Sequence, residues 1–442
     1  MIKKPIDRKL TVFDGWALGA GVMIGATIFV ASGYMSGIAG PAAALSFVLA
    51  AFVTMIIAVC YCELSSAFPR SGGAYIYPKE TIKGRPGIII SFVTGWAFYG
   101  GQGLGSAVVA LTCAFYINWT LELVGVINPI PDNIFAMLII VFFAISNIID
   151  SKFGRLIQSV STFIVVGALT LFIVLGGVNV DPVLLTPFAP YGFSAVVAAG
   201  AIGWAAFGGW SAIPNMSSEF RDPARDVPRS MLLSVAFCSV LFAVVVVVMN
   251  GLMPYTQLAV ENAPLAAAAA TFTRYGAIII AFGGIFASAT TLNGLMMAGS
   301  HMLASMGREG SLPHILSKKN ERNGTPRIAL FTTSIGMLLL ASTGLALIIL
   351  QMVAFVTAFS WIVACLCVYA LRINRKDVTS LYRTPLYPVT PIVAVLLALI
   401  MMSRMSPIAI MVGCIWIAVG FVLFVLFAHT PLKNLCHNDQ QQ

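Results

Sequence analysis

Long apolar stretches follow one another along almost the whole chain, and short polar turns separate them. Each stretch reaches roughly the 20 residues that an α-helix needs to cross a hydrocarbon layer about 30 Å thick. The pattern therefore predicts an all-α polytopic membrane protein with about twelve transmembrane helices. The expected spans are 13–37, 41–68, 87–117, 133–149, 156–178, 193–217, 229–252, 275–300, 327–343, 345–371, 386–403 and 406–428.

The positive charges fall almost entirely on one side of these spans. With the N-terminus in the cytoplasm, 23 of the 25 Lys and Arg residues lie on the cytoplasmic side, and Arg274 and Arg404 lie on the other. This is the positive-inside bias of membrane proteins. We expect an even number of spans with both termini cytoplasmic, in the plasma membrane or, in a prokaryote, the inner membrane. The net charge of +9 then reflects membrane topology and not nucleic-acid binding.

The composition argues against other classes of protein. The chain is 59% hydrophobic and 9% charged, whereas soluble domains carry about 25% charged residues. Seven of its eight cysteines lie in apolar runs, where they act as small hydrophobes, and its histidines show no metal-ligand spacing. A membrane-embedded enzyme would need His, Asp or Glu clustered inside the spans. We expect one transmembrane domain over residues 1–442, with no enzymatic activity, cofactor or metal.

Two spans are interrupted by glycine. Gly19, Gly21 and Gly25 fall within the first span, and glycines recur within 203–211 of the sixth. Each glycine weakens a helix by about 1 kcal/mol relative to alanine. Gly-interrupted helices at matching positions of two halves are typical of inverted-repeat transporters, which bind substrate at mid-membrane between the broken helices. We expect one repeat at about 13–178, a second at about 193–371, and two extra helices at about 386–428.

Helix ends at such breaks suit a small zwitterion. Amides at a half-helix N-terminus attract a carboxylate, and freed carbonyls at a C-terminus attract an ammonium group. We assign the amides around 20–25 to the carboxylate and the carbonyls around 204–208 to the amino group of an α-amino acid. The substrate-binding residues expected from the first, third and sixth spans are Ala20, Gly21, Met23, Ile24, Gly25, Ala26, Gln102, Trp204, Phe207, Gly208 and Trp210. The aromatic residues among them are equally compatible with packing against lipid or neighbouring helices.

Several local patterns, taken in order, resemble the amino acid, polyamine and organocation (APC) transporter superfamily. They are GVMIGATIF at 21–29, YCELS at 61–65 with GGAYIY at 72–77, EFRDP with VPR at 219–229, and MGREGSLP at 306–313. The resemblance implies a five-plus-five inverted repeat of the leucine-transporter type with discontinuous helices 1 and 6, followed by two extra helices. It also implies transport by alternating access.

The expected substrate is a small amino acid, most simply a neutral one. No carboxylate lies inside the spans where a second positive charge would rest. The family's arginine-type exchangers place an acidic residue near the position of Trp210, and this departure argues against a dibasic substrate. A polyamine or cationic amino acid carrier, and a sensor that binds an amino acid without moving it, remain as alternatives. The sequence leaves a homodimer open.

The sequence offers several candidate residues for coupling transport to an ion. Proton-coupled relatives carry a lysine in the fifth span, and the approximate place here is Val165. Glu63, Tyr75 and Glu219 are candidates for gating or for carrying a proton, with arginines at 70, 221, 225 and 229 as ion-pair partners of the two carboxylates. Weaker candidates for a sodium site are the hydroxyls of Ser288, Thr290 and Thr291, which more commonly bond their own helix.

Overall fold

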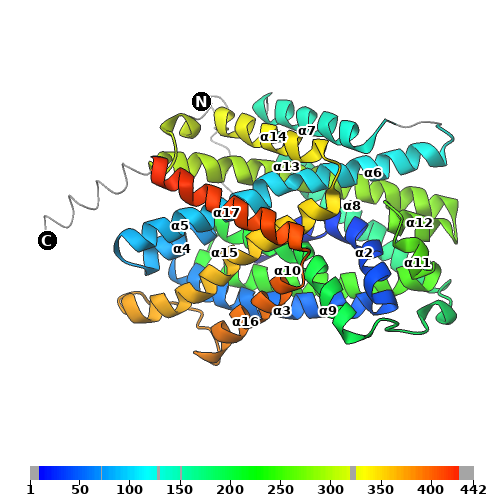
Figure 1. Ribbon diagram of the computed structural model, residues 1–442, viewed down its shortest axis with the longest axis horizontal. Coiled ribbons are helices and arrows are strands. Elements are labelled where there is room, and N and C mark those ends of the chain that lie inside the picture. The colour runs from blue at the N-terminus through cyan, green and yellow to red at the C-terminus, as the bar shows by residue number, and fades with distance from the viewer. Residues whose placement is uncertain (1–8, 71, 127–129, 150–151, 319–324, 428–442) are drawn as a thin grey trace, which may run out of the picture.

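Every regular element among residues 9–70, 72–126, 130–149, 152–318 and 325–427, which the computed structural model describes, is helical except for one isolated β-bridge. The helices run side by side along the long axis of the molecule (Figure 1). The α-helices are α1 (Val12–Met23), α2 (Ala26–Ala39), α3 (Ala43–Ala67), α4 (Gly73–Thr81), α5 (Gly84–Phe98), α6 (Ala107–Leu123), α7 (Asp132–Ile149), α8 (Lys152–Gly177), α9 (Gly192–Gly203), α10 (Pro223–Leu252), α11 (Tyr255–Leu258), α12 (Pro264–Ala270), α13 (Arg274–Arg308), α14 (Arg327–Ser342), α15 (Ala346–Asn374), α16 (Val389–Ser403) and α17 (Pro407–Phe427).

Short 3₁₀-helical and π-helical segments join these helices. They are the 3₁₀ turns η1 (Gly40–Ala42), η3 (Leu104–Ser106), η4 (Pro182–Leu185) and η6 (His314–Ser317), the longer 3₁₀ segment η5 (Trp204–Glu219), and the π-helical turn η2 (Tyr99–Gly103). The turns η2 and η5 matter most, because both fall inside predicted spans.

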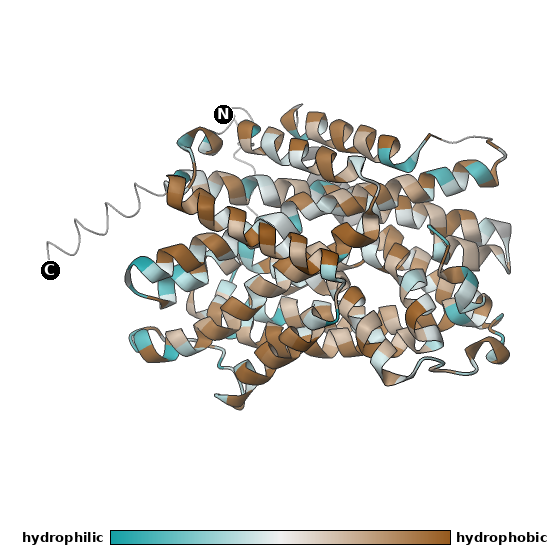
Figure 2. Cartoon of the chain, viewed as in Figure 1, coloured by the Kyte–Doolittle hydropathy of each residue, from teal (hydrophilic) through white to brown (hydrophobic). Residues whose placement is uncertain are grey.

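Membrane-spanning character is clear from helix length and composition. Seven helical stretches among the described residues are long and apolar enough to cross a membrane: Thr27–Ala67, Gly84–Leu123, Gly192–Ser217, Pro223–Leu252, Tyr275–Arg308, Ala346–Asn374 and Pro407–Phe427. The other predicted spans fall on shorter apolar helices: Val12–Met23, Asp132–Ile148, Ser161–Gly177, Arg327–Ser342 and Val389–Ser403. Apolar residues cover the helices, and polar residues gather at the turns at both ends of the bundle (Figure 2). The number of crossings and the inverted repeat stay predictions.

The first predicted span is broken, as its glycines indicate. The helix α1 ends at Met23, Ile24 leaves helical geometry with ψ 41°, and Gly25 is extended before α2 begins. A capping box between Thr11 and Asp14 fixes the start of α1. Further along, the hydroxyl oxygens of Ser230 and Ser234 on α10 lie 3.0 Å and 3.2 Å from the carbonyl oxygens of Val12 and Trp16. The short helix before the break is therefore held against α10.

The sixth span differs from its predicted form. Instead of an unwound gap, the chain passes from α9 directly into η5, which winds as a 3₁₀-helix with one departure at Met216. Such a run is unusual, because 3₁₀-helices longer than three or four residues are uncommon. Side chains three residues apart lie one above another in this winding. Trp204, Phe207 and Trp210 consequently form one row of η5, and Gly208 lies outside that row.

The helix α17 is joined to α5 through two tryptophans. The indole nitrogen of Trp96 donates to the carbonyl of Trp416 at 2.9 Å, and that of Trp416 donates to the carbonyl of Trp96 at 3.1 Å. Their rings stack with centroids 4.6 Å apart. A Cβ added at Gly100, in the π-helical turn, would lie 2.1 Å from the indole nitrogen of Trp416. The glycine is what allows this close approach.

We therefore expect Gly100→Val to lower the free energy of unfolding by about 1–3 kcal/mol, the usual cost of overpacking a tight interior site. Thermal unfolding of the purified protein in detergent measures this loss. Gly177→Val is the control, because a Cβ at Gly177 meets no atom of the described residues within 4 Å. Equal stability of the two variants would contradict the prediction.

Candidate functional site

The backbone at the break in the first span is surrounded closely by other helices. A Cβ added at Gly25 would lie 2.9 Å from Thr291 on α13, and one at Gly21 would lie 2.4 Å from the hydroxyl oxygen of Thr162 on α8. Ala20, Met23 and Ile24 are buried. Ala26 is the first residue of α2, and its side chain lies outside the part of the chain that the structure describes.

The free amides lie slightly later in the chain than the sequence indicates. The amide of Ile24 donates to the carbonyl of Ala20 at 2.8 Å, so it is already used within α1. The helix α2 has no side-chain cap at Gly25, and the first amides of a helix have no partner within it. Amides that face a ligand at this break therefore belong to the start of α2.

The π-helical turn η2 and the segment η5 meet at this region. A Cβ added at Gly208 would lie 2.9 Å from the amide nitrogen Nε2 of Gln102, and apart from the adjoining residues of η5 no other described atom lies within 4 Å of it. A Cβ added at Gly209 would lie 2.6 Å from the backbone nitrogen of Met23. Residues predicted from three separate spans are thus brought together at their irregular turns, with an amide side chain facing the open side of Gly208.

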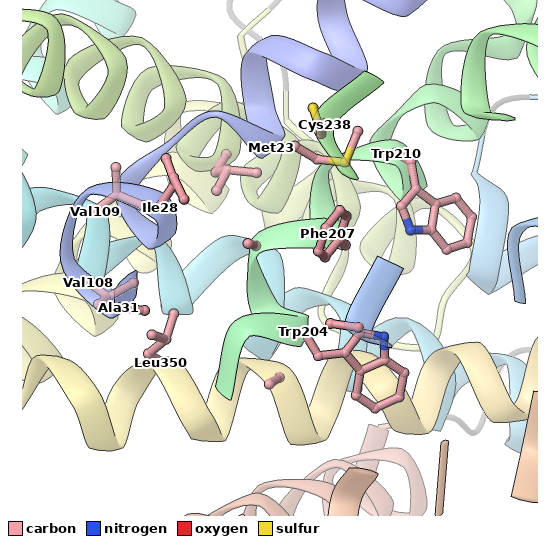
Figure 3. Packing of buried hydrophobic residues seen from close by; sticks show 14 of the residues in the cluster. Met23, Ile28, Ala31, Val108, Val109, Trp204, Phe207, Trp210, Cys238 and Leu350 are labelled. Carbon is pink, nitrogen blue, oxygen red and sulfur yellow. The ribbon is translucent and has the colours of Figure 1, made fainter. Parts of the chain in front are cut away.

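The aromatic residues of η5 pack against other helices. Trp204 donates its indole N–H to the hydroxyl of Thr54 at 3.0 Å. Phe207 lies against Phe47 and Phe242, with ring centroids 6.5 Å and 5.4 Å away. All three η5 aromatics are fully buried, and Figure 3 shows them spread along the segment. Of the two sequence-based interpretations, packing describes their contacts in this structure.

Glu63 forms a buried ion pair, with a partner that the sequence did not predict. The nitrogens Nε and Nη2 of Arg372, in the last turn of α15, lie 2.9 Å and 3.0 Å from its two carboxylate oxygens. The backbone amide of Thr384 donates to the same carboxylate at 2.8 Å, and the Arg372 guanidinium lies 4.0 Å from the ring centroid of Tyr387. The ion pair therefore ties α3 to α15 and to the segment after it. The prediction of the arginines at 70, 221, 225 and 229 as partners of Glu63 was wrong.

Tyr75 joins α4 to the end of α13. Its hydroxyl donates to Glu309 at 3.3 Å, and Lys79 pairs with the same carboxylate. Burial, and then the charge of Glu309, raise the pKa of the Tyr75 hydroxyl above its ordinary value. The hydroxyl therefore stays protonated at neutral pH. Glu309 was not predicted as a site residue, although it belongs to the MGREGSLP pattern, which could have indicated it.

Glu219 lies apart from the other two gating candidates. Its side chain is exposed, and among the described residues its carboxylate forms no ion pair. Its backbone carbonyl accepts a hydrogen bond from the amide of Leu10 at 2.8 Å, beside the isolated bridge between Leu10 and Phe220. The structure thus places Glu63, Tyr75 and Glu219 in three separate contacts.

The hydroxyls on α13 behave differently from one another. Thr290 donates to the carbonyl of Phe286 at 2.9 Å, within its own helix. The hydroxyl oxygens of Ser288 and Thr291 are buried and have no hydrogen-bond partner among the described residues. Thr291 faces Gly25 at the break, and Thr162 on α8, rather than Val165, is the residue that lies closest to Gly21 in the last turn of α1. Hydroxyl groups from two helices therefore border the broken segment.

Histidine, cysteine and acidic side chains do not gather elsewhere as a metal centre: the described part of the chain contains no group of three or more that could hold a metal ion. The assembled geometry is that of a broken first span that meets the 3₁₀ segment η5 and the π-helical turn η2 inside a bundle of apolar helices.

Comparison with known proteins agrees with that geometry. Residues 10–431 match the model of a family described as amino acid permease. The chain belongs to this family. It is accordingly a multi-pass membrane protein of the APC superfamily, as its local patterns indicated, and its family implies a small amino acid substrate.

Two relatives of this permease are matched over nearly their whole length, and a third over part of its length. It is 26% identical to the branched-chain amino acid permease BcaP of Bacillus subtilis (strain 168), with 98% of this chain and 95% of the relative covered. It is 28% identical to the methylthioribose transporter of the same organism, covering 96% and 94%. It is 30% identical to the chloroplastic cationic amino acid transporter 9 of Arabidopsis thaliana, covering 70% of this chain and 57% of the relative.

Proposed function

We propose that this permease carries a small neutral amino acid across the plasma or inner membrane by alternating access. The observation that carries the proposal is the meeting of Gln102 and Gly208 beside the break between α1 and α2. This arrangement offers an amide group and free helix-end amides to a zwitterion, with unfilled space at the glycine. Twelve spans, cytoplasmic termini and a five-plus-five repeat form part of the proposal, supported by irregular winding at matching positions of the first and sixth spans.

A neutral side chain fits the groups at this site. The described residues that meet there supply an amide, backbone groups, hydroxyls and apolar side chains, and no carboxylate. A second positive charge buried in the membrane would lack a partner, which is costly. The relatives named as carrying branched-chain amino acids and methylthioribose are compatible with this choice. The relative named as a cationic amino acid transporter supports the alternative, a cationic or polyamine substrate.

Uptake into proteoliposomes tests the proposal. The panel comprises radiolabelled neutral, cationic and acidic amino acids, methylthioribose and putrescine, with and without internal substrate. We expect saturable uptake of a neutral amino acid. Uptake of arginine or putrescine in preference would favour the cationic alternative, and binding without uptake would favour a sensor.

The unpartnered hydroxyls of Ser288 and Thr291 favour sodium as a second candidate for coupling. Replacing them by Ser288→Ala and Thr291→Val removes both unpartnered oxygens, of which that of Thr291 faces the break at Gly25. If sodium binds there, we expect the sodium stimulation of uptake to disappear while exchange of substrate continues. Thr290→Val is the control, because the Thr290 hydroxyl already bonds its own helix. Uptake that never depended on sodium in the unsubstituted protein would exclude the candidate.

A further inference from the structure

A row of buried hydrogen-bonding groups without partners begins on α15 and continues onto two neighbouring segments. The hydroxyl of Thr357, the indole nitrogens of Trp361 and Trp210, and the hydroxyl of Tyr61 have no hydrogen-bond partner among the described residues. The exposed fraction of each of these side chains is 2% or less. Buried Trp and Tyr usually find a partner for their polar atom. Several buried donors without partners in one place lower the stability of the fold, unless another molecule forms hydrogen bonds with them.

These groups are neighbours that connect three helical segments. Thr357 and Trp361 lie one turn apart on the same face of α15. The ring of Trp361 lies 5.3 Å from that of Trp210 on η5, and the ring of Trp210 lies 4.8 Å from that of Tyr61 on α3 at a right angle. The row is therefore continuous from α15 through η5 to α3.

One end of the row lies at the substrate site, and the other lies near the buried ion pair. A Cβ added at Gly101, the residue before Gln102, would lie 2.2 Å from the Thr357 hydroxyl. At the opposite end, Tyr61 is two residues from Glu63 on α3, whose partner is Arg372 further along α15. The row thus occupies the space between the Gln102 turn and the Glu63–Arg372 ion pair.

Trp204 shows that a buried tryptophan of this cluster can find a hydrogen-bond partner. Its ring also packs against Trp361, with centroids 5.3 Å apart, yet its indole N–H is bonded to Thr54. A buried tryptophan in the same cluster is therefore satisfied when its nitrogen points to α3. Within this cluster, the unpaired groups are those that border the route from Gln102 to the ion pair; other described side chains, Ser288 and Thr291 among them, also lack partners.

We propose that Thr357, Trp361, Trp210 and Tyr61 form a second substrate site, which receives the carboxylate of the amino acid after it leaves the Gln102–Gly208 site. The inference rests on the proposed function. Indole N–H and hydroxyl groups donate to a carboxylate, and such charge-assisted bonds are stronger than neutral ones. The faces of the indole rings attract the ammonium group of the same molecule. The ion pair beyond the row closes its far end.

The test removes three of the four donors and keeps an aromatic ring at each position, with the triple variant Tyr61→Phe/Trp210→Phe/Trp361→Phe. We expect equilibrium binding to purified protein to stay within twofold of the unsubstituted value, because the first site is intact. Substrate exchange in proteoliposomes should fall tenfold or more at saturating substrate, with KM little changed. The thermal midpoint of the substrate-free protein should fall in this variant and in the control alike, because a phenyl ring is smaller than a buried indole and leaves a cavity.

Trp96→Phe is the matched control, since it removes an indole that is already bonded, to the carbonyl of Trp416, and lies outside the row and the substrate site. It should lower the thermal midpoint and leave the ratio of exchange rate to binding unchanged. Unchanged exchange in the triple variant would overturn the second site, and so would a parallel loss of binding and exchange. If the unsubstituted protein binds none of the panel, the proposed function fails, and the second site fails with it.

Discussion

Gly208→Leu is expected to lower the affinity for substrate about 100-fold or more, a loss of about 3 kcal/mol. The new side chain would occupy the space in front of the Gln102 amide, where a Cβ alone already lies 2.9 Å from Nε2. Little else lies near that position among the described residues, so the chain has room to fold around the leucine. Equilibrium binding of the amino acid identified by uptake measures the loss.

The control for this prediction is Gly167→Leu. Gly167 lies on α8, inside a predicted span, and a Cβ added there meets no described atom within 4 Å. Both variants gain the same side chain inside a predicted span, but Gly167 is exposed at the surface of the bundle whereas Gly208 is buried, and only Gly208→Leu fills the proposed site. Both should insert and purify normally. Unimpaired binding by Gly208→Leu would remove Gly208 and Gln102 from the site.

Local sequence features predicted the parts of the site that depend on backbone winding. The glycines of the first span indicated the break that occurs at 24–25. The sequence placed Gln102 and Gly208 in the same candidate site, but it did not predict that they lie side by side. It could not be derived further, because the π-helical turn that carries Gln102 has no recognisable sequence signal. The same limit applies to η5. Its glycines predicted an interrupted helix, whereas the chain there forms a 3₁₀-helix.

Contacts between distant segments could not be predicted from the sequence. Glu63 and Arg372 are 309 residues apart, and nothing local distinguishes Arg372 from the other basic residues at span ends. The arginines nearest in sequence were chosen as partners, whereas the fold places the end of α15 beside the end of α3. For the same reason, the sequence could not show whether Trp204, Phe207 and Trp210 face a substrate or other helices.

The second large effect concerns this ion pair, and Glu63→Gln is expected to lower the free energy of unfolding by about 3 kcal/mol. The substitution leaves the Arg372 guanidinium without its partner in a place where the Glu63 side chain is only 3% exposed. We place the loss at the lower end of the range for buried pairs because the Arg372 side chain is 28% exposed. Thermal and denaturant unfolding in detergent measure it.

The double variant Glu63→Gln/Arg372→Gln separates an ion pair that holds the helices from a carboxylate that carries a proton. The effects of substituting two residues in direct contact are not additive, so the double variant should be more stable than Glu63→Gln alone. It should also regain the uptake that the single variant loses with its stability. If Glu63 instead carries the coupled proton, the double variant would exchange substrate normally and fail to accumulate it under an imposed pH gradient. Removing the carboxylate leaves no group at position 63 to take up a proton, and restoring the charge balance cannot compensate for that.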